Sequence, residues 1–364
     1  MPLDPYFAER LRTHRRYLLR QAWGRLRGSL SRWHSALGGW RTGASAAGDA
    51  RPETAPAAPG TRASRPATLR ARHRRAALAW DREELATAGT PGPDVPTEEF
   101  DVAVPGYPDV RVRVYRPATD GKIRPAVLHF YGGAFRIGGI DYPTTDAACR
   151  RRAADADVVV VAVAYALAPE RRFPTQVEQA HAALEWLVRE AEQLGVDSSR
   201  LAVSGTSAGG AIAAAVTLMN RDRRRHPLRL QLLEVPVTDL TGRRIDFRPT
   251  WAMGVPALLV LRELRSVART YLADPGDARH PYASPLRAPD HSGLPPALIL
   301  TAEYDNLRRD GAAYGAALRS AGVPATVVRY LGVGHDTPIY TSALPAAAAW
   351  HDQVVGALRS LHRD

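Results

Sequence analysis

The stretch Leu201-Ala-Val-Ser-Gly-Thr-Ser-Ala-Gly-Gly-Ala-Ile212 predicts a short apolar strand that turns sharply at Ser207 into a helix of small residues. Within it, residues 205–209 fit the pattern Gly-x-Ser-x-Gly. A serine on such a turn projects its Oγ above the sheet edge, and the backbone passes so close that only glycine fits two positions before and after it. The N–H of Ala208 would then point at a reacting carbonyl from the positive end of the helix. The pattern predicts Ser207 as a nucleophile; a serine that merely caps the helix is the alternative.

A nucleophilic serine needs a base within hydrogen-bond reach. In enzymes that use this turn, an acid and then a histidine follow the serine along the chain. His335 lies in Gly332-Val-Gly-His-Asp336, a glycine-flanked loop after a predicted strand over residues 326–330. The other histidines after Ser207 lie in segments rich in Arg and Pro or on the last predicted helix. The sequence therefore predicts His335 as the base.

The base in turn needs an acid that orients it. Asp305 follows a predicted strand over residues 296–301, immediately before the strand that leads to His335. Three alternatives stay open: Glu303 lies two residues past that strand, Asp310 suits the start of the following helix, and Asp239 lies one strand earlier. The position at a strand's C-terminal end favours Asp305.

A loop of small residues follows the predicted strand 126–131, in Tyr131-Gly132-Gly133-Ala134-Phe135. Small side chains let a backbone approach a substrate closely. The loop's place after the third strand predicts a second set of N–H donors facing Ser207, as in His-Gly-Gly-Gly-type loops. A loop that is merely flexible is the alternative.

From residue 99 onward, predicted strands and helices alternate, which is typical of a doubly wound, mostly parallel sheet. An unbroken β-branched run over residues 158–161 predicts a central parallel strand there. We expect eight strands, at residues 100–104, 110–115, 126–131, 157–165, 201–203, 228–235, 296–301 and 326–330. We expect helices at residues 68–87, 176–193, 207–221, 258–272, 309–321 and 342–361.

Four segments together resemble the hormone-sensitive-lipase-like branch of the α/β-hydrolase fold, the bacterial carboxylesterases and arylacetamide deacetylases. They are the loop at 132–135, Tyr165-Ala-Leu-Ala-Pro-Glu170 with Phe173-Pro174, the turn at 205–210, and the segment from 294 through Asp305 to His335. The resemblance covers roughly residues 95–362. It implies a catalytic triad of Ser207, Asp305 and His335, with backbone donors of an oxyanion hole at Gly132, Gly133, Ala134 and Ala208.

The chain departs from that family at three positions: the family usually has His at Tyr131, Gly at Ala134 and Asp at Thr206. None of the three is a triad residue, so we expect activity with an altered rate or substrate preference. The family residue at position 131 braces the loop. Alanine at 134 keeps the backbone N–H.

The resemblance implies a serine carboxylic-ester hydrolase that acts on short-to-medium acyl esters through an acyl-enzyme, with no metal and no cofactor. An amide deacetylase or an acyltransferase with the same triad is an alternative, and a non-catalytic ligand-binding homologue is a further one. The implied helical cap comprises residues 67–90 and about 240–272. Trp251, Met253 and Leu258 are expected to wall an apolar substrate pocket within it.

The basic charge of the chain is confined to its N-terminal part. The formal net charge is +12, and residues 1–82 contain seventeen Arg and five acidic residues, so residues 83–364 are neutral in sum. We expect residues 1–37 to form a basic amphipathic helix, with a stripe of Leu and Trp over residues 23–40. Residues 38–66 are expected to form a flexible linker, and residues 67–364 the catalytic domain. This helix could pack on the domain, on a second copy or on an anionic membrane surface, and no specific nucleic acid is expected.

Cysteine content and hydropathy indicate the compartment. Cys149 is the single cysteine, which excludes an internal disulfide and fits a reducing environment. No apolar run is long enough to span a membrane, and the N-terminal residues do not resemble a secretory signal. We therefore expect a cytoplasmic protein, with residues 1–40 available for contact with a membrane surface or for self-association.

Overall fold

The computed structural model describes residues 1–13 and 65–363. Contacts divide the chain into two units, one of Met1–Leu3 with His73–Asp364 and one of Asp4–Arg72. In the smaller unit residues 5–13 are helical, and the rest of the predicted N-terminal helix and the predicted linker lie outside the described residues. No helix in the described part of the chain has the length and apolarity that crossing a bilayer requires.

An eight-stranded sheet forms the centre of the larger unit, in the order β1-β2-β4-β3-β5-β6-β7-β8. β1 and β2 pair in antiparallel fashion, as do β2 and β4, and every later pair is parallel. The predicted doubly wound, mostly parallel sheet is therefore confirmed. The strands are β1 (Thr97–Val102), β2 (Val110–Tyr115), β3 (Arg124–Phe130), β4 (Val159–Val163), β5 (Val196–Thr206), β6 (Leu228–Glu234), β7 (Ala297–Tyr304) and β8 (Ala325–Gly334).

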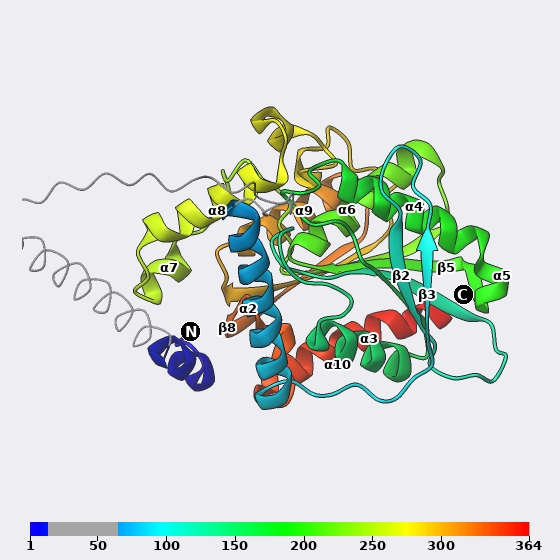
Figure 1. Cartoon of the computed structure of the whole chain (residues 1–364), viewed down its shortest axis with the longest axis horizontal. Helices are drawn as coiled ribbons and strands as arrows, with labels where there is room; N and C mark the ends of the chain where they lie inside the picture. The colour runs from blue at the N-terminus through cyan, green and yellow to red at the C-terminus, as the bar shows by residue number, and fades with distance from the viewer. Residues whose placement is uncertain (14–64, 364) are drawn as a thin grey trace, which may run out of the picture. The chain divides into compact units, whose positions relative to one another are not determined.

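Helices cover both faces of the sheet (Figure 1), as burial on both faces requires of parallel strands. α4, α6 and α9 lie on one face and α3 and α10 on the other. The helices are α2 (Arg65–Thr87), α3 (Pro143–Ala156), α4 (Thr175–Arg189), α5 (Ala191–Leu194), α6 (Ala208–Arg223), α7 (Arg248–Ala252), α8 (Ala257–Tyr271), α9 (Arg308–Ser320) and α10 (Pro345–Arg359). Short 3₁₀ turns occur at Pro275–Arg279, Pro285–Arg287, Thr337–Ile339 and Ser360–His362.

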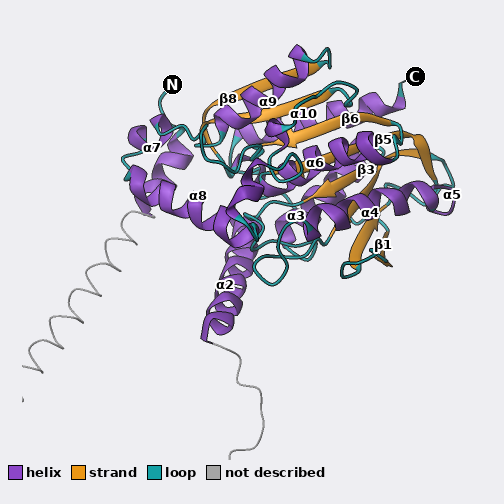
Figure 2. Cartoon of the chain, turned by 90° about the horizontal axis from the view of Figure 1, so that it is seen from above, coloured by secondary structure: helices purple, strands orange, loops and turns teal. Residues whose placement is uncertain are grey.

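The core lies along the middle strands. Every residue of β3 and β4 is buried, which explains the unbroken apolar run of β4. β4 is parallel to β3 on one side but antiparallel to β2 on the other, so it stands where the sheet changes direction. α8 lies away from the sheet (Figure 2), whereas α7 contacts β7.

The sequence did not predict α3. This helix connects β3 to the parallel strand β4, and its buried residues include Arg151 and Arg152 as well as alanines. A buried face that contains arginines gives no apolar periodicity to recognise. Several strands also extend beyond their predicted ends: β5 begins at Val196, β7 reaches Tyr304 and β8 reaches Gly334.

Candidate active site

The turn at Ser207 has the strained geometry that its sequence predicted. β5 leads directly into Ser207, whose backbone has φ 56° and ψ −113°, and α6 begins at the next residue. A side chain at Gly205 would place its Cβ 2.1 Å from the carbonyl oxygen of Gly209, and one at Gly209 would place its Cβ 2.0 Å from that of Phe130. Both glycines are therefore required by backbone contacts. The N–H of Ser207 donates to the carbonyl of Glu234 at 2.8 Å, which ties the turn to β6.

The structure brings Ser207, His335 and Asp305 together in one hydrogen-bonded chain. His335 Nε2 lies 3.0 Å from Ser207 Oγ, and His335 Nδ1 lies 2.9 Å from Asp305 Oδ2. Asp305 comes directly after β7, and His335 directly after β8, so the ends of neighbouring parallel strands position both side chains. The Asp305 carboxylate is buried and also accepts the N–H of Leu307 at 2.8 Å, which fixes its orientation.

The charges around His335 favour the protonated form of its imidazole. Burial by itself lowers the pKa of His335, but the charge of Asp305 and its hydrogen bond outweigh that effect and raise the pKa to about 9. The His335 side chain remains 34% exposed toward the cavity. The histidine is thus held by a buried carboxylate on one side and is accessible to a ligand on the other.

The three alternative acids have other partners. Glu303 accepts the N–H of Gly332 at 2.7 Å. Asp310 accepts the N–H groups of Thr238 and Asp239 at 2.9 and 3.0 Å, and Asp239 itself pairs with Arg287 at 2.8 Å. None of these carboxylates is hydrogen-bonded to His335 in the described chain.

The glycine loop after β3 passes directly beside the turn. A Cβ placed on Gly132 would lie 3.2 Å from the carbonyl oxygen of Thr206 and 3.6 Å from Cβ of Ser207. Gly133 has φ 130°, and a Cβ there would lie 2.1 Å from the carbonyl oxygen of Ile137, so this position requires glycine. Ala134 adopts φ 54° without being glycine. Gly132, Gly133 and Ala134 line the same cavity as Ser207, while Ala208 is the first residue of α6 and is buried.

Tyr131 braces the loop by a reciprocal pair of contacts. Its hydroxyl donates to the carbonyl of Tyr165 at 2.9 Å, and the Tyr165 hydroxyl donates to the carbonyl of Tyr131 at 2.8 Å. The two rings are stacked with centroids 4.2 Å apart. Behind the loop, Phe135 stacks on Tyr271 of α8 at 3.8 Å. The residue that departs from the family pattern at position 131 therefore has a bracing contact of its own.

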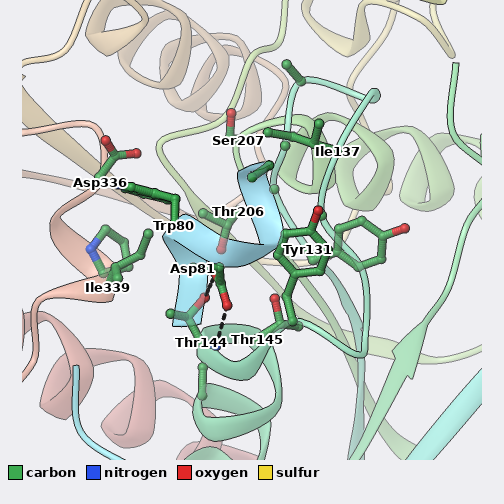
Figure 3. Close-up of a pocket in the computed structure, with 18 of the residues that line it drawn as sticks. Trp80, Asp81, Tyr131, Ile137, Thr144, Thr145, Thr206, Ser207, Asp336 and Ile339 are labelled. Carbon is green, nitrogen blue, oxygen red and sulfur yellow. Dashed lines mark hydrogen bonds between the residues drawn. The ribbon is translucent and has the colours of Figure 1, made fainter. Parts of the chain in front are cut away.

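A cavity of about 400 Å³ opens beside Ser207 (Figure 3). This volume lies in the range typical of small-molecule sites. α2 supplies one wall with Ala77, Trp80, Asp81 and Leu85. Asp81 is buried and accepts hydrogen bonds from the backbone N–H of Thr144 at 3.0 Å and from the Thr144 hydroxyl. This interaction fixes α2 against α3, so part of the predicted cap segment 67–90 lines the cavity beside Ser207.

The second predicted cap segment contributes far less to this wall. Of residues 240–272, the described cavity lining includes Glu263 and not Trp251, Met253 or Leu258, so that expectation is wrong. Trp251 and Leu258 are 68% and 73% exposed. An apolar residue in a cap segment can face solvent as readily as substrate, and the sequence did not distinguish the two.

A buried polar network beneath the turn was not predicted. The Glu234 carboxylate accepts hydrogen bonds from Arg152 Nη2 at 2.7 Å and from Trp350 Nε1 at 2.8 Å, and the Thr206 hydroxyl lies 3.4 Å from it. Because the carbonyl of Glu234 also accepts the N–H of Ser207, this network supports the turn. The available signal was a glutamate directly after the apolar pair Leu232-Leu233 of a predicted strand.

Ser204 and His129 form a second serine–histidine pair, and no carboxylate among the described residues is hydrogen-bonded to this histidine. His129 Nδ1 lies 2.9 Å from Ser204 Oγ and 3.3 Å from Arg152 Nη1. Burial, together with the charge of Arg152, holds the pKa of His129 well below its usual range. Within the described residues no group of three or more His, Cys, Asp or Glu side chains is placed to hold a metal ion.

Comparison with known proteins shows the same fold. A family profile described as the α/β hydrolase fold matches residues 127–339. The esterase LipI of Mycobacterium tuberculosis is 37% identical over 262 residues, which cover 69% of this chain and 78% of LipI. An ethyl acetate hydrolase of Pseudomonas putida is 39% identical over 228 residues, which cover 62% of this chain and 70% of that enzyme. The solved structure of EstE1, a thermostable carboxylesterase cloned from a metagenomic library, superposes with a TM-score of 0.72 at 35% identity, covering 81% of this chain and 98% of EstE1.

Proposed function

Because this chain belongs to the α/β-hydrolase family, we propose that it hydrolyses short-to-medium acyl esters of carboxylic acids, with Ser207 as nucleophile, His335 as base and Asp305 as the orienting acid. The observation that carries the proposal is the position of His335, hydrogen-bonded to Ser207 Oγ at 3.0 Å and to Asp305 at 2.9 Å. The relatives named above are an esterase, an ethyl acetate hydrolase and a carboxylesterase, which supports the same activity here.

The reaction proceeds in two displacements. Ser207 Oγ attacks the acyl carbon of the ester while His335 Nε2 takes the hydroxyl proton, and a tetrahedral oxyanion forms. The intermediate collapses to an acyl-enzyme as the alcohol leaves with the proton from His335. A water molecule then gives a proton to His335 and attacks the acyl carbon, which releases the carboxylic acid and restores the Ser207 hydroxyl.

The oxyanion is stabilised by backbone N–H groups of Gly132, Gly133, Ala134 and Ala208. The close approach of Gly132 to Ser207 and the position of Ala208 at the start of α6 support this assignment. A helix N-terminus carries a partial positive charge that favours a developing anion. Donors fixed before the reaction begins are worth more than donors that must reorient.

Covalent labelling and kinetics test the nucleophile. We expect Ser207→Ala to lose at least about 10⁴-fold in kcat on p-nitrophenyl butyrate, and to lose labelling by a fluorophosphonate. Ser204→Ala is the matched control, because Ser204 also lies beside a histidine, 2.9 Å from His129; it should keep both. Activity of purified Ser207→Ala within tenfold of wild type would overturn the assignment.

Amide hydrolysis with the same triad is the second candidate activity, because the triad does not itself select an ester over an amide. A comparison of p-nitrophenyl acetate with p-nitroacetanilide separates the two. We expect turnover of the ester, and equal or higher kcat/KM on the anilide would move the assignment to an amide deacetylase. Acyl transfer is detected in the same assay by adding an alcohol acceptor and measuring the new ester.

The basic segment of residues 1–40 is proposed to contact an anionic membrane surface or a second copy of the chain. Its arginines and Leu/Trp stripe support either contact. Each arginine near an anionic surface is worth about 1 kcal/mol, so membrane contact would weaken with added salt.

A further inference from the structure

One face of α3 forms a part of the cavity wall that adjoins α2. Its lining residues are Thr144, Thr145, Ala148, Arg151 and Arg152, which recur at the three- and four-residue spacing of a helix face. Figure 3 shows Thr144 beside Asp81 of α2, with Thr145 on the same helix. Seven residues separate Thr144 from Arg151, which corresponds to about 10 Å along a helix. The cavity wall therefore changes from small side chains to two arginines along α3.

Arg151 is a buried cation without an ion-pair partner among the described residues. It is 9% exposed, and no carboxylate among the described residues lies within ion-pair distance of it. Its Nη1 donates to the carbonyl of Thr90, while its buried Nε has no hydrogen-bond partner in the described chain. A neutral carbonyl satisfies one donor but does not form an ion pair with the guanidinium.

The neighbouring arginines on α3 differ in this respect. Arg152 pairs with Glu234 at 2.7 Å, so its charge is already compensated. Arg150 pairs with Asp146 at 2.7 Å and with Asp94 at 3.4 Å, and it lines a different groove of the surface. Of these three arginines, Arg151 alone combines a place in the cavity wall with the absence of an ion pair among the described residues.

Burying a charge without an ion-pair partner is unfavourable, and proteins usually supply a partner. Burial and the charge of Arg152 lower the pKa of Arg151 to about 10, although the charge of Asp155 acts in the opposite direction, so Arg151 stays protonated at neutral pH.

Three acidic residues line the cavity wall in the described chain. Asp81 is held by Thr144, Glu263 pairs with Arg136, and Asp336 follows His335 directly and helps to raise the pKa of its imidazole. An anion carried by a ligand would supply Arg151 with an ion-pair partner.

Building on the ester hydrolysis proposed above, we infer that the Arg151 end of the cavity binds a carboxylate of the substrate. The enzyme then prefers esters whose acyl chain ends in a second carboxylate, the half-esters of dicarboxylic acids. Ser207 attacks the ester carbonyl at one end of the cavity, and Arg151 binds the free carboxylate at the other. Leu85 and Ile339 provide apolar wall for the methylene chain in the same cavity.

Matched ester pairs of equal chain length test this preference. Mono-p-nitrophenyl glutarate, adipate and suberate are compared with p-nitrophenyl pentanoate, hexanoate and octanoate. The measured quantity is the ratio of kcat/KM for the anionic ester to that for the neutral one. We expect Arg151→Gln to lower this ratio by about 10- to 100-fold, the range for a lost hydrogen bond to a charged group, and the loss should fall mainly on KM.

Two further variants separate charge from general structure. Arg151→Lys retains a cation and should restore most of the ratio. Arg150→Gln removes a neighbouring arginine that does not line the cavity, and it should leave the ratio at the wild-type value. A second pair, 4-carboxyphenyl acetate and its methyl ester, places the carboxylate on the leaving group; if Arg151→Gln changes the ratio for this pair alone, the anion site stands and its carboxylate comes from the alcohol.

A binding measurement does not depend on turnover. Adipate should bind to Ser207→Ala by calorimetry and should bind at least tenfold more weakly to the double variant with Arg151→Gln. Equal ratios in wild type and Arg151→Gln for both ester pairs would overturn the inference, while hydrolysis of the neutral esters would still support the proposed function. Failure of the intact protein to hydrolyse any ester would instead overturn the proposed function.

Discussion

Replacing Asp305 by Asn tests the geometry of the site most sharply. The substitution keeps the size of a buried side chain, but it removes the charge that His335 Nδ1 contacts at 2.9 Å. An asparagine amide can also donate to Nδ1, which would leave the proton on Nε2, where the base must accept one from Ser207. We expect kcat to fall by about 10⁴-fold through this wrong tautomer, which is about 5 kcal/mol of transition-state stabilisation.

The pH dependence supplies a second readout of the same substitution. His335 must be neutral to accept the proton of Ser207, so kcat/KM rises with pH as the imidazole loses its proton. An unperturbed histidine would place this rise near pH 6.5 to 7, whereas the Asp305 carboxylate raises the pKa of His335 to about 9. In Asp305→Asn the raising charge is gone and the lowering effect of burial remains, so the midpoint should shift downward.

Initial rates on ethyl butyrate in a pH-stat, from about pH 5 to pH 10, measure both effects without a chromogenic leaving group. Glu303→Gln and Asp310→Asn are the controls, because both carboxylates accept backbone N–H groups rather than the imidazole. A near-wild-type rate in Asp305→Asn together with a collapse in Glu303→Gln would move the acid to Glu303. A large loss in Asp305→Asn with an unchanged midpoint would refute the electrostatic argument.

One substitution tests the loop after β3, and one deletion tests the N-terminal segment. Tyr131→Phe keeps the stacking on Tyr165 but loses the hydroxyl that donates at 2.9 Å, so kcat should fall by up to the 10²- to 10³-fold of one lost oxyanion donor; an unchanged kcat with the variant folded by circular dichroism would show that the loop does not depend on this bond. If the N-terminal segment is a surface anchor, deleting residues 1–64 should leave kcat/KM on soluble short-chain esters at the wild-type value. The same deletion should abolish salt-sensitive binding to anionic vesicles, measured by co-sedimentation. A large loss on longer acyl chains would instead assign the segment to the substrate pocket.

The positions of the site residues could be predicted because they depend on local chain geometry. The turn at Ser207 requires glycine at 205 and 209, and both requirements are visible in the sequence. Asp305 and His335 follow neighbouring parallel strands, β7 and β8, and the C-terminal ends of such strands meet at one edge of the sheet. Strand order and sequence spacing thus place three distant residues together without knowledge of side-chain packing.

The cavity wall depends on tertiary contacts that the sequence does not encode locally. α2 lines the cavity beside Ser207 because Asp81 accepts a hydrogen bond from Thr144 on another helix, a pairing between residues 63 positions apart. Trp251 and Leu258 lie in a segment that was correctly predicted to be helical in part, yet they point to solvent. An amphipathic pattern tells which residues share a face but not what that face meets.

α3 shows why a helix with a functional face is the hardest to predict. Parallel strands need a crossover of a dozen or more residues, so the 28 residues between Phe130 and Val159 required a connecting element, and Pro143 with Asp146 are typical of a helix start. The apolar periodicity that would have identified it is missing because Arg151 and Arg152 occupy buried positions of the helix. Arg152 is explained by Glu234, which stabilises the turn at Ser207. Arg151 interrupts the apolar pattern in the same way but has no carboxylate within ion-pair distance in the described chain. The substrate carboxylate inferred above would supply that partner.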